Sequence, residues 1–226
     1  MNSSSMEYYP ELLLPTAYFP PVSYFAYLIQ SSAAKIEQWE TYPKQTYRNR
    51  CEIMTSAGKM NLVVPVIKTN GNNTMTRDIG ICYREPWQSH HWKSIMTAYR
   101  SSPFFNYYAD IFHPLFNLKE SSLIRLNEKT LAAILQITGI KVELQLTSNF
   151  VRNPDACSDL RSIMKPTHEH ETMIPSYPQV FSHLHGFMNN LSILDLIFNM
   201  GPESKDYLLA LELQHAYKAP GGRTDE

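Results

Sequence analysis

The chain has 226 residues and a mass of 26.1 kDa, a length that suits one large domain or two small ones. It carries 20 Lys and Arg against 21 Asp and Glu, so it lacks the basic excess typical of proteins that bind nucleic acid or anionic membranes. With 43% hydrophobic and 18% charged residues it can bury a core and is not disordered. Its three cysteines, Cys51, Cys82 and Cys157, lack CxxC spacing, which argues against a disulfide framework and a Cys-rich zinc site.

The first residues lack the positive and apolar regions of a secretory signal, and the longest apolar stretch, residues 62–67, is interrupted by Pro65. We therefore expect a cytoplasmic protein with no membrane insertion. We also expect a single domain over residues 7–218. Residues 219–226 contain Pro220, Gly221 and Gly222 without an apolar anchor, so we expect a flexible tail.

The N-terminal part predicts a strand–helix–strand unit. Leu12, Leu13 and Leu14 begin a first strand that continues through residues 17–19. Residues 22–30 carry apolar side chains at helical spacing after Pro20 and Pro21, and residues 34–39 form a short second strand. This order is typical of an α/β unit.

The middle of the chain predicts β-structure followed by helices. Strands over residues 45–54 and 59–67 flank a hairpin turn at Ala57-Gly58, and residues 78–83 form a further strand. Helices are expected over residues 87–100 and after Ser102. A third helix is expected to be capped by Asn127 and to end at Gly139.

The last third predicts one strand, one long loop and two helices. The strand covers residues 140–146, and the loop covers residues 149–179, which show no hydrophobic period. Asn190 is expected to cap a helix over residues 191–200, and Pro202 to start another that runs to Leu213. The fold class is thus α/β, with an N-terminal strand–helix–strand unit, a β-hairpin region and a mostly helical C-terminal half.

Two arginines form the first candidate site. In a strand, Arg48 and Arg50 share one face, and two guanidinium groups on one face can bind a phosphate or a carboxylate. The alternative is a solvated cationic face, or pairing with acidic residues elsewhere. On the first interpretation, we expect one of the two at the entrance of the largest polar cleft.

A second candidate is a carboxylate in the most apolar helix. Asp195 and Asn199 lie four residues apart, hence on one helix face. Because a buried carboxylate needs partners, we expect Asp195 to contact a cationic side chain or several backbone N–H groups. It either acts as a catalytic base or ties the helix to the rest of the protein.

The aromatic helix supplies a third candidate. His91 borders its apolar face and Lys93 is nearby, so they suit acid/base chemistry and anion binding, although a single histidine there is more often a packing residue. The helix that follows Pro21 also has an N-terminus that could meet an anion.

Metal and nucleotide signatures are weak. The pairs His168/His170 and His183/His185 could hold zinc with Glu169 or Glu171, but neither HExxH nor a Cys partner accompanies them, so we predict no metal site. No glycine-rich phosphate-binding motif occurs, and the sequence identifies no cofactor.

Several segments together resemble the WbqC-like family of bacterial proteins encoded among surface-polysaccharide genes. The similar segments are residues 18–25 (YFPPVSYF), 47–50 (YRNR), 62–66 (LVVPV), 87–99 and 191–202 (LSILDLIFNMGP). Ser23 stands where the family has Gly, and residues 149–179 lack a Gly-rich segment of longer members. With this resemblance, the predicted substrate-binding set is Tyr18, Tyr24, Tyr47, Arg48, Asn49, Arg50, Lys93 and Asn199, and the catalytic candidates are His91 and Asp195.

The resemblance implies a role in making lipopolysaccharide, O-antigen or other surface glycans. The expected function is a group transferase that acts on an activated sugar or glycan precursor, with an anionic small-molecule substrate such as a nucleotide sugar or sugar phosphate. The alternative is a non-catalytic binding or assembly protein of the same pathway. Convergence of the candidate residues in one open cleft favours the enzyme, whereas dispersal or closed burial favours the alternative.

Overall fold

The computed structural model describes residues 11–152, 154, 157–162, 164, 166 and 174–212, and it confirms a mixed α/β fold. The α-helices are α1 (Val22–Ile29), α2 (Trp87–Tyr99), α3 (Phe105–Phe112), α4 (Leu123–Thr138), α5 (Ser182–His185), α6 (Ile193–Met200) and α7 (Ser204–Leu209). The strands are β1 (Leu12–Pro15), β2 (Ala33–Glu37), β3 (Arg50–Thr55), β4 (Gly58–Val63), β5 (Val66–Ile67), β6 (Gly80–Ile81), β7 (Glu143–Leu146) and β8 (Ser158–Asp159). Short 3-10 helices include η2 (Thr76–Asp78) and η3 (His113–Asn117).

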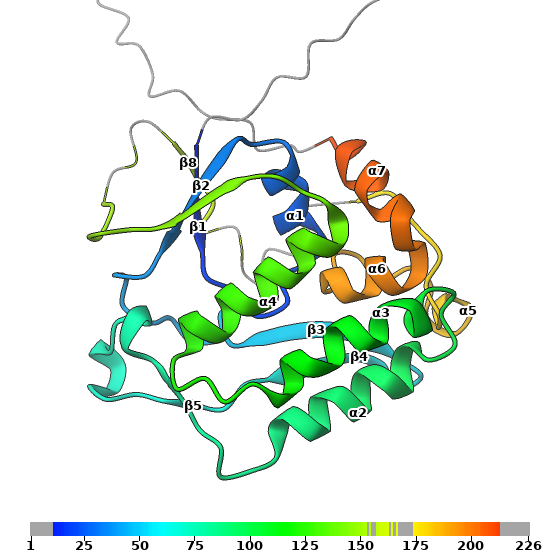
Figure 1. The fold of residues 1–226 in the computed structure, drawn as a ribbon, viewed down its shortest axis with the longest axis horizontal. Helices are drawn as coiled ribbons and strands as arrows, with labels where there is room; N and C mark the ends of the chain where they lie inside the picture. Colours follow the sequence, from blue (N-terminus) through cyan, green and yellow to red (C-terminus); the bar gives the residue numbers. More distant parts are fainter. Residues whose placement is uncertain are drawn as a thin grey trace, which may run out of the picture.

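Four parallel strands form the central sheet in the order β7-β2-β1-β8 (Figure 1). In β1, Leu12, Leu13 and Leu14 are completely buried, which explains their uninterrupted apolar run, because a parallel strand covered on both faces has no solvent side. The chain adds β2 and then β7 on one side of β1, and it later places β8 on the other side. The direction of winding therefore reverses at β1.

Helices and a hairpin enclose this sheet. The β3–β4 hairpin pairs Arg50 with Val63 and Thr55 with Gly58, which confirms the predicted turn at Ala57-Gly58. Helix α6 contacts α1, α3 and β3, and seven of its residues are buried (Figure 1). Within the described part of the chain, no helix has the length and apolarity needed to cross a membrane.

The predicted strands are longer than the observed ones. Residues 59–67 divide into β4 and β5, and residues 78–83 contain only β6 because Asp78 belongs to η2. Strand β2 ends at Glu37 rather than at residue 39, and β7 begins at Glu143 rather than at residue 140.

In two further strands the cause of the shortening is a sharp turn of the backbone. The first strand ends at Pro15 rather than at Phe19, whose φ of 40° is incompatible with an extended strand. Strand β3 begins at Arg50 rather than at Gln45, which has a φ of 56°. Arg48 therefore precedes the strand, and the prediction that it shares a strand face with Arg50 is wrong.

Two predicted helix caps are also wrong. Helix α4 begins four residues before Asn127, which lies buried within it. Ser192 caps α6 by accepting a hydrogen bond from the Leu194 N–H, whereas Asn190 adopts a φ of 52° and binds α1. Both asparagines thus contact distant parts of the chain instead of the helix end nearest to them.

Residues 149–179 are only partly described. Where they are described they contain the two-residue strand β8, which the sequence did not predict, and no α-helix. The last helix, α7, ends at Leu209, short of the predicted end at Leu213. The predicted tail over residues 219–226 lies outside the described residues.

Candidate functional site

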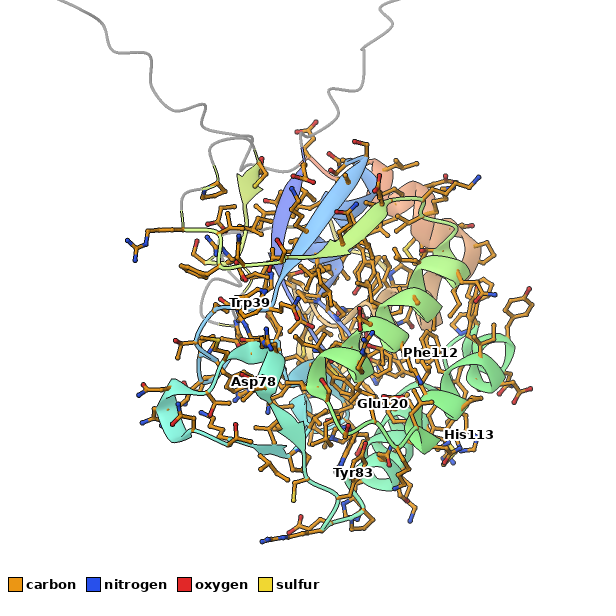
Figure 2. All side chains as sticks on the ribbon, turned by 60° about the vertical axis from the view of Figure 1, so that its left-hand side comes forward. Trp39, Asp78, Tyr83, Phe112, His113 and Glu120 are labelled. Atoms are coloured by element: carbon orange, nitrogen blue, oxygen red, sulfur yellow. The ribbon has the colours of Figure 1, made fainter. Side chains whose placement is uncertain are left out.

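Charged side chains gather where the parallel strands end. Glu37 closes β2, Glu40 lies three residues beyond it, and Asp159 and Arg161 stand at the end of β8. In Figure 2, Trp39 marks the chain just after β2, on the side of the molecule where η2 carries Asp78. Because carboxyl ends of parallel strands meet at one edge of a sheet, the fold brings together residues that are far apart in sequence.

Glu37 ties three strands together. Its side chain has no solvent exposure. Oε1 accepts hydrogen bonds from the Trp39 N–H at 2.7 Å and from the Thr147 hydroxyl at 2.9 Å. Oε2 accepts from the Val151 N–H at 3.0 Å and from Arg161 Nη1 at 3.2 Å. All of its acceptor capacity is used inside the protein, so Glu37 is a structural residue.

Arg48 and Glu40 form a buried ion pair that involves only one oxygen of the Glu40 carboxylate. The Arg48 side chain is 1% exposed, and both Nε, at 2.9 Å, and Nη2, at 2.5 Å, donate to the same oxygen, Oε1 of Glu40. Arg48 Nη1 has no hydrogen-bond partner among the described residues. Burial raises the pKa of Glu40 even though Arg48 opposes it. The pair thus holds an open donor beside a carboxyl group whose pKa is raised by burial.

The backbone around Arg48 is held from three directions. Tyr47 accepts a hydrogen bond from the Tyr18 N–H at 2.8 Å, and the side chain of Asn49 donates to the carbonyl of Val64 at 2.9 Å. From α4, the amide of Asn127 donates to the Arg48 carbonyl at 2.9 Å and to Thr16 Oγ1, just beyond β1, at 3.0 Å. These bonds fix the guanidinium position near the end of β1.

Four more buried polar atoms near this pair lack a hydrogen-bond partner among the described residues: Thr46 Oγ1, Arg50 Nε, Thr76 Oγ1 and Asn127 Oδ1. Thr46 and Arg50 each lie two residues from Arg48 in the sequence, and Asn127 donates a hydrogen bond to the Arg48 carbonyl. Thr76 donates its N–H to the Glu40 carbonyl, and the guanidinium groups of Arg48 and Arg50 both lower the pKa of Tyr42. Buried polar groups normally have partners, so such a group of unsatisfied atoms is what a polar ligand or ordered water would complete.

Three predicted tyrosines lie in the core beside this edge. Tyr18 and Tyr47 are buried, and Tyr24 donates its hydroxyl proton to the Pro15 carbonyl at 3.1 Å. Burial raises the pKa of Tyr24, while nearby Arg48 opposes the increase. Tyr24 thus links α1, the end of β1 and the buried arginine.

His91 is held as a neutral imidazole in another part of the core. Nδ1 lies 3.1 Å from the Tyr18 hydroxyl, and a second hydrogen bond joins the ring to the Val63 backbone. Burial lowers the pKa of His91 to about 4. A backbone carbonyl only accepts, so the proton belongs on the nitrogen that faces Val63, and the Tyr18 hydroxyl donates to the other. The ring has no free nitrogen.

Asp195 is buried as predicted, but its hydrogen-bond partners among the described residues are neutral. Oδ2 accepts hydrogen bonds from the Tyr177 hydroxyl at 2.7 Å and from Gln179 Nε2 at 2.8 Å. Tyr99 approaches without the geometry of a full hydrogen bond and still lowers the pKa. Burial outweighs these contacts and raises the pKa of Asp195 to about 6. The expected cation or cluster of backbone N–H groups is absent from the described contacts, and Asn199 donates only to the Asp195 carbonyl.

The remaining predicted groups lie elsewhere. Lys93 is exposed on α2 and lines a cavity of about 400 Å³ on the hairpin side of the molecule. The N-terminus of α1 is not free for an anion, because Val22 and Ser23 donate their N–H groups to Leu191 and Asn190. Neither Arg48 nor Arg50 lines the cavity beside Lys93, nor the smaller ones beside Trp92 and Leu131.

Metal-ligand groups do not cluster in the described part of the chain, where no set of three His, Cys, Asp or Glu side chains could hold an ion. His185 instead contacts the Ser56 carbonyl at 3.0 Å. His168, His170, Glu169 and Glu171 lie outside the described residues.

Glu37, Glu40 and Arg161 were not predicted from the sequence. One signal for the two glutamates was present, since Glu37 ends β2 and Glu40 follows it, at the end where parallel sheets collect polar side chains. Arg161 had no comparable signal, because β8 is only two residues long.

Comparisons with known proteins found matches that cover most of this chain. A family model described as the WbqC-like protein family matches residues 16–171. An uncharacterized protein of Mycobacterium tuberculosis, Rv1507c, is 27% identical over 197 residues, which cover 74% of this chain and 83% of that protein. No solved structure matches this chain significantly.

Proposed function

This chain belongs to the WbqC-like protein family, and we propose that it is a group transferase that binds an anionic, activated sugar or glycan precursor at the carboxyl edge of its parallel sheet. The unpartnered Nη1 of buried Arg48 carries the proposal. A guanidinium group held in place by Glu40 and shielded from water is a strong ligand for a phosphate oxygen, because its remaining donor is already oriented.

The strand order supports this location. The order β7-β2-β1-β8 corresponds to 3-2-1-4 in sequence, and sheets wound in this way bind ligands outside the strand ends where the winding reverses. That point lies beside β1, next to the segment that holds Arg48. Because the first N–H groups of α1 are already used, binding of phosphate here depends on arginine rather than on a helix end.

Glu40 is the residue best placed for proton transfer. Its Oε2 accepts no hydrogen bond from the described residues, 15% of its side chain remains exposed, and its pKa is raised. In the proposed reaction, an acceptor hydroxyl oxygen bonds to the transferred group while the bond from that group to phosphate breaks. The hydroxyl proton passes to Glu40, and the phosphate leaves with the bonding electrons toward Arg48.

The proposal includes a role in surface-polysaccharide synthesis in the cytoplasm. Three cysteines without disulfide bonds support a reducing compartment. The proposed ligand is a nucleotide sugar or sugar phosphate. The family membership and the buried guanidinium group of Arg48 support this choice.

A non-catalytic binding protein is the second candidate. The observation in its favour is that His91 and Asp195 do not meet in one open cleft, since each is buried within its own set of hydrogen bonds. On this interpretation Arg48 still binds an anion, but no group is transferred.

One experiment tests both candidates. Calorimetric titration with a panel of nucleotide sugars and sugar phosphates should identify a ligand, and Arg48→Lys should weaken its binding. Arg100→Gln, at an exposed arginine after α2, serves as the control. If a ligand binds, release of nucleotide or phosphate in the presence of acceptor glycans supports the transferase, and Glu40→Gln should abolish that release. Absence of turnover with intact binding would support the second candidate. Both candidates would be refuted if Arg48→Lys weakened the binding of no compound in the panel.

A further inference from the structure

A cavity lies beside the turn of the β3–β4 hairpin, at the end of β3 remote from Arg48. It opens between the hairpin turn and α2, with a volume of about 400 Å³, and is bounded on a third side by Phe181. Its nine lining residues are Thr55, Ser56, Ala57, Met60, Lys93, Ser94, Thr97, Ala98 and Phe181. Strand β3 runs from Arg50 to Thr55, so about 17 Å of strand separates its two ends. Figure 1 shows this hairpin passing behind α3 toward α2.

The lining combines two apolar walls with a hydroxyl-bearing rim. Met60, Ala98 and Phe181 supply apolar surface, whereas the hairpin contributes the hydroxyl group of Ser56. The Thr55 hydroxyl is already used within the turn, where it donates to the Gly58 carbonyl at 2.8 Å and accepts from the Ala57 N–H at 3.3 Å. Further hydroxyl groups come from one face of α2, at Ser94 and Thr97. A purely apolar ligand would strip water from these groups without replacing their hydrogen bonds, which is unfavourable. The cavity therefore suits a molecule with both C–H faces and hydroxyl edges.

Lys93 gives the cavity its charge. It is the one ionisable side chain in the lining, and no hydrogen bond or ion pair joins its ammonium group to the described residues. An exposed ammonium group without a carboxylate partner beside a concave surface favours an anionic substituent on the ligand.

The buried carboxylate of Asp195 holds the three walls together. Tyr99, next to Ala98 on α2, approaches this carboxylate and accepts a hydrogen bond from the Met54 N–H of β3 at 3.4 Å. Gln179, two residues before Phe181, donates to Asp195 at 2.8 Å. The hairpin, α2 and the segment at Phe181 each therefore have a residue next to the cavity lining that takes part in the buried contacts around Asp195. Preformed walls reduce the entropy lost when a ligand binds.

We propose that this cavity binds a single sugar ring that carries an anionic group, either a phosphate or a carboxylate. The C–H face of the ring packs on Phe181 and Met60, ring hydroxyl groups bond to Thr97 and Ser94, and the anionic group binds Lys93. The cavity volume of about 400 Å³ falls within the range of typical ligand cavities, roughly 300–1,000 Å³. The inference does not depend on the transferase proposal, because the cavity and Arg48 lie at opposite ends of β3.

The test is a titration of the full chain followed by ¹⁵N NMR. The ligands are glucose 1-phosphate, glucuronate, glucose and inorganic phosphate. We expect the two anionic sugars to shift the amide signals of residues 55–57 and 93–98 and to bind more tightly than glucose or phosphate alone. A preference for glucose 1-phosphate or for glucuronate identifies which anionic group the site takes.

Variants separate this site from the Arg48 site. Lys93→Gln should weaken binding of both anionic sugars by about tenfold and leave binding of glucose unchanged, because it removes one charge-assisted contact. Lys141→Gln, at an exposed lysine elsewhere, is the matched control. Arg48→Lys should not change these shifts, which distinguishes failure here from failure of the transferase proposal. The inference is overturned if neither anionic sugar shifts these signals, if Lys93→Gln binds as tightly as the native chain, or if octanoate binds more tightly than either sugar.

Discussion

Arg48 donates two hydrogen bonds to one oxygen of Glu40, so the guanidinium group keeps Nη1 and the carboxylate keeps Oε2 without a partner among the described residues. A pair that served only stability would be expected to use both carboxylate oxygens, since bidentate pairing is stronger. The geometry instead leaves one donor and one acceptor available on adjacent groups.

The first prediction concerns the energy of this pair. Arg48→Ala and Glu40→Ala should each destabilise the fold by about 3 kcal/mol, because each leaves the other charge desolvated. The double variant should lose less than the sum, with a coupling energy of about 2 kcal/mol. Urea denaturation of the four proteins measures it, and strictly additive losses would contradict a direct pairing.

The second prediction concerns Asp195. Its folded pKa of about 6 lies above its ordinary value of 3.8, so its ionisation disfavours the folded state. Its contribution to stability is fully present below pH 3.8 and is lost as the pH rises to about 6. Relative to the native chain, Asp195→Asn should therefore gain about 3 kcal/mol of unfolding free energy across this window. Asp78→Asn, at an exposed carboxylate, is the control; an unchanged difference across the window would contradict the shift.

The third prediction concerns His91, which acts in the opposite direction. Its folded pKa of about 4 lies below its ordinary value of 6.5, so its contribution is present above pH 6.5 and is lost as the pH falls toward 4. As the pH falls through this range, the native chain should lose about 3 kcal/mol of unfolding free energy from this residue, and His91→Gln should not show this loss. His113→Gln, at an exposed histidine, is the control. Denaturation at several pH values measures it, and the same pH dependence in His91→Gln and the native chain would refute it.

These two effects nearly cancel in the native chain. Between pH 4 and 6 the gain from Asp195 on acidification offsets the loss from His91, because the slopes are equal and opposite. The two single variants should therefore show opposite pH slopes, and the double variant should regain the native slope.

The fourth prediction concerns Gly201, which ends α6. Its φ is +55°, and a Cβ atom there would lie 2.5 Å from the ring of Phe104. Gly201→Ala should thus cost about 3 kcal/mol, from backbone strain and from overpacking. Gly71→Ala separates the two causes, because Gly71 has a similar φ of +50° but open space around it, and should cost about 1 kcal/mol. Equal losses in thermal melts would contradict the packing contribution.

Sequence periodicity predicted the burial of Asp195 but not its partners. A helix that is apolar all round must be buried, and that reasoning is local. Tyr177 and Gln179 belong to a segment without a hydrophobic period, so no pattern placed them against α6. The prediction that Arg48 and Arg50 share a strand face failed for a related reason. The turn at Gln45 shortens β3, and no glycine stands at this position to indicate a positive φ.

The fold class was predictable because the strand and helix periods of β1, α1 and β2 are clear. The site at the sheet edge was not, since it depends on which strands become neighbours. Strand β8 joins β1 from more than 140 residues away along the chain, and its two residues give no periodic signal.

The contact between α1 and the segment before α6 has a consequence for biosynthesis. Ser23 donates its N–H to Asn190 across 167 residues, and Ser192 donates its hydroxyl proton to the Phe19 carbonyl across 173 residues. The first strand–helix unit cannot complete these hydrogen bonds until residues 190–192 have been synthesised. Bringing such distant segments together costs loop-closure entropy before any contact compensates for it. During synthesis the N-terminal unit therefore lacks these contacts, although seven residues of α1 are buried in the folded chain.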